Sequence, residues 1–186
     1  MDRCTVPRQE NILCVYQNVR GLRSKTSEVL MNACNMDAPI LCLSETWLSH
    51  DIQDSELLLN LFSVYRSDRN FIASGKSRGG GVLFAHQEYL KCRQISLSTY
   101  NFPSETDIVC VRTTCMIPKI TFIVVYVPAD ASQKIYDEFI DSLSLLCMKI
   151  DGQEMIVGDS NIPHLDYPSN GRSRSLLGFA EFRVTP

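Results

Sequence analysis

Short apolar runs separated by polar residues recur along the chain. They cover residues 12–16, 40–43, 81–85, 108–112, 120–127 and 155–157. Their length and their β-branched content predict strands rather than helices. The run over 120–127 is almost entirely apolar, which predicts a central strand covered on both faces.

Two longer segments have apolar residues at helical spacing instead. We expect helices over 27–35 and 132–149, with Ser132 as the N-cap of the second. The apolar faces are Val29, Leu30, Ala33 and Cys34 in the first segment, and Ile135, Phe139, Ile140, Leu143, Leu146 and Cys147 in the second. This interleaving of strands and helices predicts an α/β layered domain, not a helical bundle or a pure β sandwich.

Length and composition fit one domain. The chain has 186 residues, 45% of them hydrophobic and 21% charged. We expect a polar tail over 1–10 and one domain over 11–186. The first residues lack the apolar stretch of a secretory signal, and no apolar run is long enough to cross a bilayer. The sequence therefore predicts a soluble, intracellular protein that is not secreted and has no membrane partner.

The cysteines are expected to be free. Of the 8 in the chain, Cys14, Cys42, Cys110 and Cys147 lie within apolar segments, and no CxxC or Cys/His ligand spacing occurs. A small apolar side chain with a weak donor suits such positions. Buried thiols are therefore favoured over a disulfide framework.

The overall charge gives no general attraction to nucleic acid. The formal net charge is −3 and the pI is about 5.6. Any DNA contact must be local, and two basic neighbourhoods are candidates: Arg66, Arg69, Lys76 and Arg78 in the first, Arg172 and Arg174 in the second. Each is either a DNA contact or an ordinary solvated surface.

Polar side chains follow several of the expected strands where each strand ends. They are Asn18, Glu45, Tyr126, Asp159 and Asn161. Carboxylate, carboxamide and phenol groups that meet at one edge of a sheet indicate a convergent site. A carboxylate such as Glu45 can hold Mg²⁺, Asp159 can orient or deprotonate a water, and Tyr126 and Asn161 can donate to oxygens that gain charge. These types fit phosphodiester hydrolysis.

Structural interpretations compete with each of these roles. Tyr126 also fits a core tyrosine, and Asp159 with Asn161 also fits a local Asx-turn. Trp47, the only tryptophan, is most simply a packing residue. The glycines at 79–81 precede a strand and no Lys-Ser or Lys-Thr pair follows, so they predict a turn with close backbone approach rather than a phosphate-binding loop.

The chain also resembles a known superfamily. The segments that carry the resemblance are N-V-R-G at 18–21, S-E-T-W at 44–47, Y-R-S-D-R at 65–69, G-G-G-V at 79–82, V-Y-V-P at 125–128 and G-D-S-N at 158–161. Their wording is similar to the endonuclease/exonuclease/phosphatase superfamily, and their order more narrowly to the apurinic-type endonuclease domain of non-LTR (LINE-type) retrotransposons. The resemblance extends from residue 11 to about 182.

What the resemblance implies is an α/β (α+β) fold, a four-layer sandwich of two facing mixed β-sheets flanked by helices, with Mg²⁺ or Mn²⁺ at one end. It implies that Glu45 is the metal ligand and that Asn18 belongs to the phosphate and metal network. By the same resemblance Tyr126 packs near the scissile phosphate, Asp159 positions the water and Asn161 stabilises the oxyanion. Such domains nick double-stranded chromosomal DNA in the nucleus, leaving a 3′-hydroxyl that primes a reverse transcriptase of the same polyprotein.

Other functions share these residues. Phosphatases and phosphodiesterases of the same superfamily use the same Asn, Glu, Asp and Asn set, and a degenerate remnant without activity would also retain it. The Y-R-S-D-R and G-G-G-V segments favour the retrotransposon branch.

Two departures from the family pattern affect the expected activity. Ser160 replaces the usual aromatic of G-D-F-N, so packing beneath Asp159 is expected to be looser. The family's closing strands and Ser-Asp-His motif have no counterpart in the printed residues, so the final strands are expected to be missing and the chain to be inactive or impaired. His164 follows the G-D-S-N segment and is not a substitute, since members of the resembled family often have a His there with a different place in the fold; it fits either a structural hydrogen bond or a DNA contact.

Overall fold

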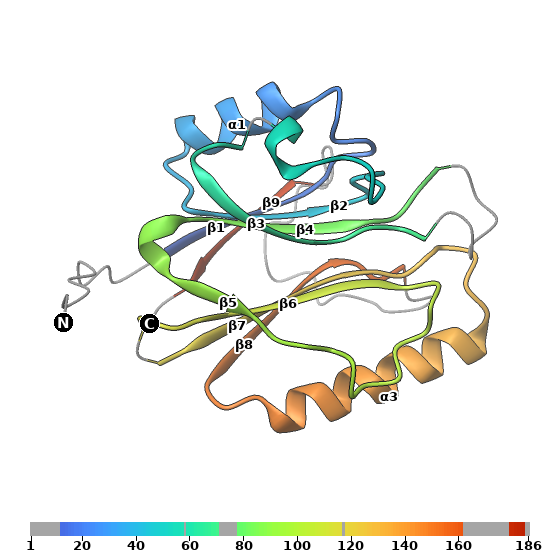
Figure 1. Ribbon diagram of the computed structural model, residues 1–186. Coiled ribbons are helices and arrows are strands. Elements are labelled where there is room, and N and C mark those ends of the chain that lie inside the picture. Colours follow the sequence, from blue (N-terminus) through green and yellow to red (C-terminus); the bar gives the residue numbers. More distant parts are fainter. Residues whose placement is uncertain (1–11, 58, 71–77, 117, 162–178, 185–186) are drawn as a thin grey trace.

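The protein is built from two β-sheets that face each other (Figure 1). The computed structural model describes residues 12–57, 59–70, 78–116, 118–161 and 179–184. The first sheet has the order β3 (Phe62–Ser67), β4 (Val82–Gln87), β2 (Ile40–Ser44), β1 (Ile12–Asn18) and β9 (Phe179–Val184). The second has the order β5 (Cys92–Gln94), β6 (Asp107–Thr113), β7 (Ile120–Tyr126) and β8 (Gln153–Asp159).

Helices cover the outer face of each sheet. Helix α1 (Thr26–Asn35) lies over the first sheet and α3 (Gln133–Lys149) over the second, so the layers run helix, sheet, sheet, helix (Figure 1). Short 3₁₀ turns occur at Asp54–Leu57 and Glu88–Leu90. Both sheets contain parallel and antiparallel pairs. The predicted four-layer sandwich of mixed sheets is confirmed.

Three apolar clusters hold these layers together. One lies between the sheets and includes Phe84 and Phe122, whose ring centroids are 5.2 Å apart. A second lies beneath α1 and a third beneath α3. Strand β7 is buried at every position, which confirms the predicted central strand.

All the predicted strands are present, and most extend a residue or two further than their apolar runs. Strands β3, β5 and β9 were not predicted. β5 has only three residues, two of them polar. β3 mixes apolar with polar side chains, and only Phe62 in it is buried. Partial burial of this kind removes the apolar run that marks a strand.

The predicted helices are confirmed, with one correction to their buried faces. Ser132 caps α3 as predicted, its hydroxyl accepting from Ile135 N at 3.4 Å. Ile140, however, is 41% exposed, while Tyr136 and Ser142 are buried. The face of α3 that contacts the sheet is narrower than the stripe of apolar residues on the helix, so Ile140 lies at the edge of that face and is partly exposed. Cys34 of α1 is exposed for the same reason.

Other expectations have clear outcomes. The cysteines of the described residues are free thiols, as predicted; Cys14, Cys42 and Cys110 are buried as expected, whereas Cys147 is only half-buried. Within that same part of the chain no helix is long and apolar enough to span a membrane. The 1–10 tail, Lys76, His164, Arg172 and Arg174 lie outside the described residues.

Candidate active site

Strand register brings the predicted polar residues to one end of the two sheets. β1 and β2 are parallel, with Asn18 beside Ser44, the residue that precedes Glu45. β7 and β8 are also parallel, with Tyr126 beside Asp159. The two sheets meet there, because Asn18 Nδ2 donates to Asp159 Oδ2 at 2.9 Å. Four of the predicted residues, Asn18, Glu45, Tyr126 and Asp159, therefore come from strand ends that face one another.

The backbone around Glu45 is strained and firmly held. Glu45 and Trp47 both have φ of 54°, a region that non-glycine residues rarely adopt and that is enriched at functional sites. Hydrogen bonds to both neighbouring loops hold this segment: Gly21 N donates to Glu45 O at 2.8 Å, Thr46 N to Gly81 O at 3.2 Å, and Trp47 N to Gly80 O at 3.0 Å. The surrounding loops thus fix a conformation that the segment would not adopt alone.

Trp47 does more than pack. Its indole Nε1 donates to Glu45 Oε2 at 3.2 Å. Its ring lies against Gly21, where an added Cβ would be 2.9 Å from Trp47 Cε3. The indole therefore orients one carboxylate oxygen and leaves Glu45 Oε1 without a hydrogen-bond partner among the described residues.

The glycines at 79–81, here called the glycine turn, lie in an irregular segment before β4, and the predicted close approach to neighbouring residues is confirmed. Their φ angles are 98°, 75° and 82°. A Cβ on Gly80 would lie 2.3 Å from Arg69 Nε, and one on Gly81 would lie 2.4 Å from Thr46 Oγ1. Both backbone conformation and space therefore require glycine at Gly80 and Gly81.

Tyr126 is a hydrogen-bond donor held in a nearly enclosed position. It is 8% exposed, and burial raises the pKa of its phenol to about 12, with the nearby Glu45 carboxylate adding to the shift and the Arg69 guanidinium opposing it. The phenol therefore stays protonated at neutral pH. It makes no hydrogen bond to another described residue.

Tyr16 is a second tyrosine at the site that sequence reasoning missed. Its hydroxyl is 2.8 Å from Ser44 Oγ. Burial raises the pKa of Tyr16 to about 12; the Ser44 hydrogen bond opposes this shift, and the carboxylates of Asp159 and Glu45 add to it. The available signal was its position two residues before Asn18, because alternate residues of a strand point to the same face.

Asn161 is placed beside the site but is engaged with the backbone. Its φ is 45°, its side-chain Nδ2 donates to Val127 O at 2.8 Å, and its backbone carbonyl accepts from Tyr136 Oη at 2.6 Å. Val127 N also donates to Asp159 O at 2.9 Å. These bonds link the ends of β7 and β8 across a long sequence separation.

The two arginines predicted to bind substrate are not surface groups. Arg69 is 5% exposed and its Nη2 is 3.0 Å from Asp107 Oδ2. The Arg66 side chain is 15% exposed; it pairs with Asp54 at 3.3 Å and Asp68 at 3.4 Å. Carboxylates of the same chain pair with both guanidinium groups, so the solvated-surface interpretation is corrected at these two positions, while their binding of substrate stays a prediction.

The oxygen atoms at the strand ends suit a hard divalent cation. Asn18 Oδ1 is buried and has no hydrogen-bond partner among the described residues, which is unusual for a polar atom. It is accompanied by the unpartnered oxygen of Glu45. Mg²⁺ prefers oxygen ligands and keeps several waters, so an amide and a carboxylate suffice. Across the described ranges no cluster of three or more His, Cys, Asp or Glu forms a tighter metal cage.

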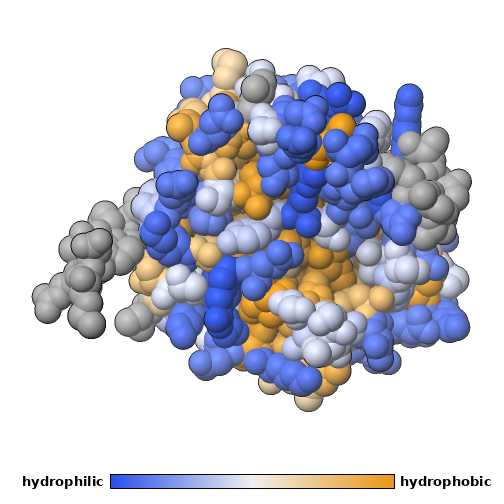
Figure 2. Space-filling view, in the orientation of Figure 1, coloured by the Kyte–Doolittle hydropathy of each residue, from blue (hydrophilic) through white to orange (hydrophobic). Residues whose placement is uncertain are grey.

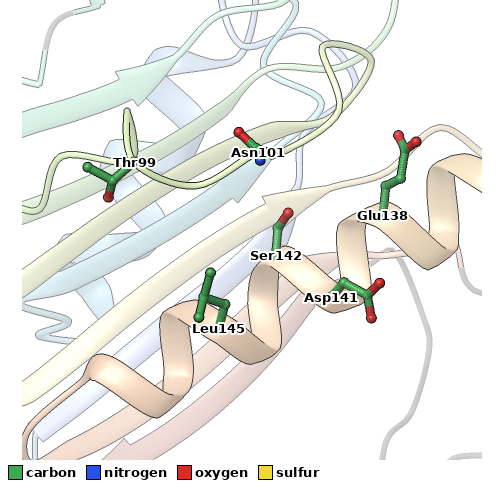
Figure 3. Close-up of a pocket in the computed structure, with 6 residues that line it drawn as sticks. All are labelled: Thr99, Asn101, Glu138, Asp141, Ser142 and Leu145. Atoms are coloured by element: carbon green, nitrogen blue, oxygen red, sulfur yellow. The ribbon is translucent and has the colours of Figure 1, made fainter.

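A groove elsewhere is a poorer candidate for binding phosphate esters. It lies between α3 and the segment before β6 and is lined by Thr99, Asn101, Glu138, Asp141, Ser142 and Leu145 (Figure 3). Its two carboxylates would repel a phosphate ester. The face of the molecule in Figure 2 shows an apolar region over the half that contains the second sheet and α3, with hydrophilic side chains around it. The strand-end cluster remains the better site.

Comparison with known proteins supports the fold. No family model matches the chain, and no curated protein matches its sequence. An AP endonuclease from Archaeoglobus fulgidus superposes with a TM-score of 0.57 at 18% identity, over 80% of this chain and 56% of that one. The Xenopus laevis APE2 catalytic domain gives 0.56 at 15%, over 81% and 59%. The human Nocturnin catalytic domain with bound sulfate gives 0.57 at 10%, over 82% and 65%.

These similarities define the fold class. The chain shares the fold of these three solved structures. It spans 56% to 65% of the length of these three proteins. At such identities the likeness concerns the fold, and the activity has to be argued from the residues of the site.

Proposed function

We propose that this chain is the metal-dependent endonuclease domain of a non-LTR retrotransposon, which nicks double-stranded DNA to leave a 3′-hydroxyl. The observation that carries the proposal is the convergence of Asn18, Glu45, Tyr126 and Asp159 where the two sheets meet. The fold shared with an AP endonuclease and with APE2 supports it. The retrotransposon assignment rests on the wording of the sequence motifs.

Glu45 and Asn18 would hold Mg²⁺, or Mn²⁺ in its place. When bound, the cation supplies neutralisation of phosphate charge and assistance to the leaving oxygen. Trp47 donates its indole N–H to Glu45 Oε2, which would orient the carboxylate for this role. The amide nitrogen of Asn18 donates to Asp159, so its amide oxygen would be the atom that binds the cation.

Asp159 and Tyr126 would act on the phosphate and the attacking water. Asp159 Oδ2 is held by Asn18, so its carboxylate has a fixed orientation from which it can accept a proton from water. Tyr126 would present its phenolic O–H, which has no hydrogen-bond partner among the described residues, to oxygens that gain charge. Asn161 would add a donor from its remaining amide hydrogen, with Val127 O fixing its orientation.

DNA is the proposed partner, and a reverse transcriptase domain of the same polyprotein would use the nick, with the nucleus as the place of action. Zebrafish (D. rerio) TDP2, solved with a single-strand DNA product, shares the fold at a TM-score of 0.52 and 10% identity. Arg69 lies beneath the ring of Tyr126, and we assign it an indirect role near the phosphate. Arg66 would contact DNA only by exchanging its present carboxylate partners.

We further propose that these residues by themselves cleave slowly. In the described part of the chain no imidazole hydrogen-bonds to the site. His86 Nδ1 lies 2.9 Å from Gln87 O, and His86 pairs with Ile40, at the opposite end of β2 from Ser44. His50 is exposed and lies near Asp51 and Asp68 rather than at the site. The proton that a family imidazole would provide therefore has no source among these groups.

Nicking of supercoiled plasmid tests the function. The 186-residue chain and a form with a family-type Ser-Asp-His segment added after Pro186 are assayed with and without Mg²⁺. Each is made with Glu45→Gln and with the exposed control Glu154→Gln. We expect the extended form to nick, Glu45→Gln to abolish nicking, and Glu154→Gln to leave it unchanged. A folded extended form that never nicks, or that nicks without needing Glu45, contradicts the proposal.

One observation favours a second function. Arg66 and Arg69 are paired with carboxylates of the same chain, which makes them less available to a long polyanion and suits a small phosphate ester better than DNA. The second candidate is therefore a phosphatase or phosphodiesterase with the same catalytic residues. Hydrolysis of a small phosphodiester, dependent on Glu45 and not accompanied by plasmid nicking, would establish it. Absence of both activities would favour a non-catalytic remnant.

A further inference from the structure

Asp107 is a buried carboxylate close to the site that none of the roles above uses. It begins β6 and is 3% exposed. Its Oδ2 accepts two hydrogen bonds, from Gly81 N at 2.8 Å and from Arg69 Nη2 at 3.0 Å. A buried carboxylate usually has hydrogen-bond or ion-pair partners that offset the cost of its desolvation. The two partners of Asp107 connect it to two different parts of the site.

The first partner leads to the metal ligand. Gly81 belongs to the glycine turn, whose carbonyls Gly80 O and Gly81 O accept from Trp47 N and Thr46 N. Those two amides belong to the two residues that directly follow Glu45, whose backbone is strained. Fixing the turn through Gly81 N therefore fixes the segment that presents the Glu45 carboxylate.

The second partner leads to the phenol. The Arg69 guanidinium carbon lies 5.2 Å from the centroid of the Tyr126 ring, and Asp107 is the register partner of Tyr126 across β6 and β7. Arg69 is 5% exposed and its Nε has no hydrogen-bond partner among the described residues. Among the described residues Asp107 is its ion-pair partner, so without Asp107 none of them would compensate the charged guanidinium buried beside Tyr126.

We propose that Asp107 is a positioning residue of the active site, which couples the Glu45 segment to Tyr126 through the glycine turn and Arg69. This inference rests on the proposed function for what the coupled groups do. The coupling itself is a property of the folded chain and can be measured without a substrate. A buried ion pair is weak evidence for stability by itself, which leaves positioning as the role to test.

Trp47 makes the test direct, because it is the only tryptophan in the chain and its indole hydrogen-bonds to Glu45. The main variant is Asp107→Leu combined with Arg69→Met. It replaces the ion pair with apolar side chains of similar size, an exchange that often preserves or raises stability. Asp107→Asn is the single-site companion. The matched control is Thr113→Val at the other end of β6, where a buried hydroxyl accepts from Ile120 N at 2.9 Å.

Two readouts separate the inference from the proposed function. In metal-free protein we expect the double variant to shift Trp47 emission and to increase its quenching by acrylamide, while Thr113→Val changes neither. In a Mn²⁺ titration we expect the double variant to bind roughly 10- to 100-fold more weakly, as for other residues that orient ligands. Wild-type Trp47 behaviour in the folded double variant without metal overturns the positioning role. An altered metal-free signal supports it even if wild-type protein binds no Mn²⁺ through Glu45, and that second result would count against the proposed function alone.

Discussion

Asn18 and Asp159 are 141 positions apart in the sequence, and their side chains meet at 2.9 Å across the two sheets. Each stands at the C-terminal end of a strand that runs parallel to its neighbour. The Asn18 amide donates to the Asp159 carboxylate. A second carboxylate in place of the amide would repel Asp159, so two anions in contact here would be unfavourable. Every role proposed for the site depends on this contact between the sheets.

Asn18→Asp should expose that dependence through pH. The variant places two carboxylates in contact, and one of them then binds a proton more readily in the folded state than in the unfolded chain. A raised folded-state pKa means that the variant gains stability relative to wild type as pH falls and loses it as pH rises. Urea unfolding at about pH 5 and pH 7.5 measures this. Identical pH dependence of the two proteins would show that the contact does not form.

Tyr126→Phe should reduce catalysis with little effect on stability. The ring and its contact with Arg69 remain, and the hydroxyl makes no hydrogen bond to another described residue. Loss of a donor to developing negative charge costs on the order of 10²- to 10³-fold in kcat. Because the pKa of Tyr126 is raised to about 12, its ionisation should not appear in the rate profile at neutral pH. An unchanged kcat in the active, extended form would remove Tyr126 from the mechanism.

The glycine turn allows backbone strain to be separated from crowding. Gly79 and Gly80 both have positive φ, of 98° and 75°, but a Cβ on Gly79 has 3.9 Å of space to Tyr126 Oη, whereas a Cβ on Gly80 lies 2.3 Å from Arg69 Nε. We expect Gly79→Ala to cost about 1–2 kcal/mol of unfolding free energy, the cost of left-handed backbone alone. Gly80→Ala should cost more, about 2–4 kcal/mol, because Arg69 and Asp107 must also move. Equal losses in chemical denaturation would mean that the buried pair is not packed against the turn.

Burial raises the pKa of Asp107 and the Arg69 charge lowers it, and burial is the larger of the two effects. It raises the pKa of Asp107 to about 6, while the Gly81 N–H and the Arg69 guanidinium lower it; Asp68 adds a small rise, and Tyr126 also faces the group. Asp107 therefore binds a proton more tightly in the folded state than in the unfolded chain. Its contribution to the free energy of unfolding increases as pH falls from about 6 toward about 4, and it decreases again as pH rises through this range. The full span is about 3 kcal/mol at most.

Comparison with Asp107→Asn isolates this effect, since the variant has no carboxyl at that position. The stability of wild type relative to the variant should grow as pH falls through this window. Growth in the opposite direction would mean that the ion pair with Arg69 outweighs burial.

The sequence predicts much of the fold because the core strands are continuous apolar runs and α3 has a clear cap in Ser132. It also identifies the strand-end residues, because polar groups that follow buried strands stand out against them. What it misses depends on tertiary partners. Arg69 looks like a surface cation until Asp107 is placed beside it, and Asp107 begins an ordinary strand. Tyr16 looks like a core residue until Ser44 and the carboxylates surround it.

Spectroscopy of bound Mn²⁺ tests the central claim most directly, that Glu45 and Asn18 hold one divalent cation where the sheets meet. Free Mn²⁺ has a sharp electron paramagnetic resonance spectrum that broadens on binding, so a titration counts ions bound to the folded 186-residue chain. We predict one site that competes with Mg²⁺, is lost in Glu45→Gln and is retained in the exposed control Glu154→Gln. Binding that is absent from the folded wild type, or equally strong in Glu45→Gln, would contradict the account.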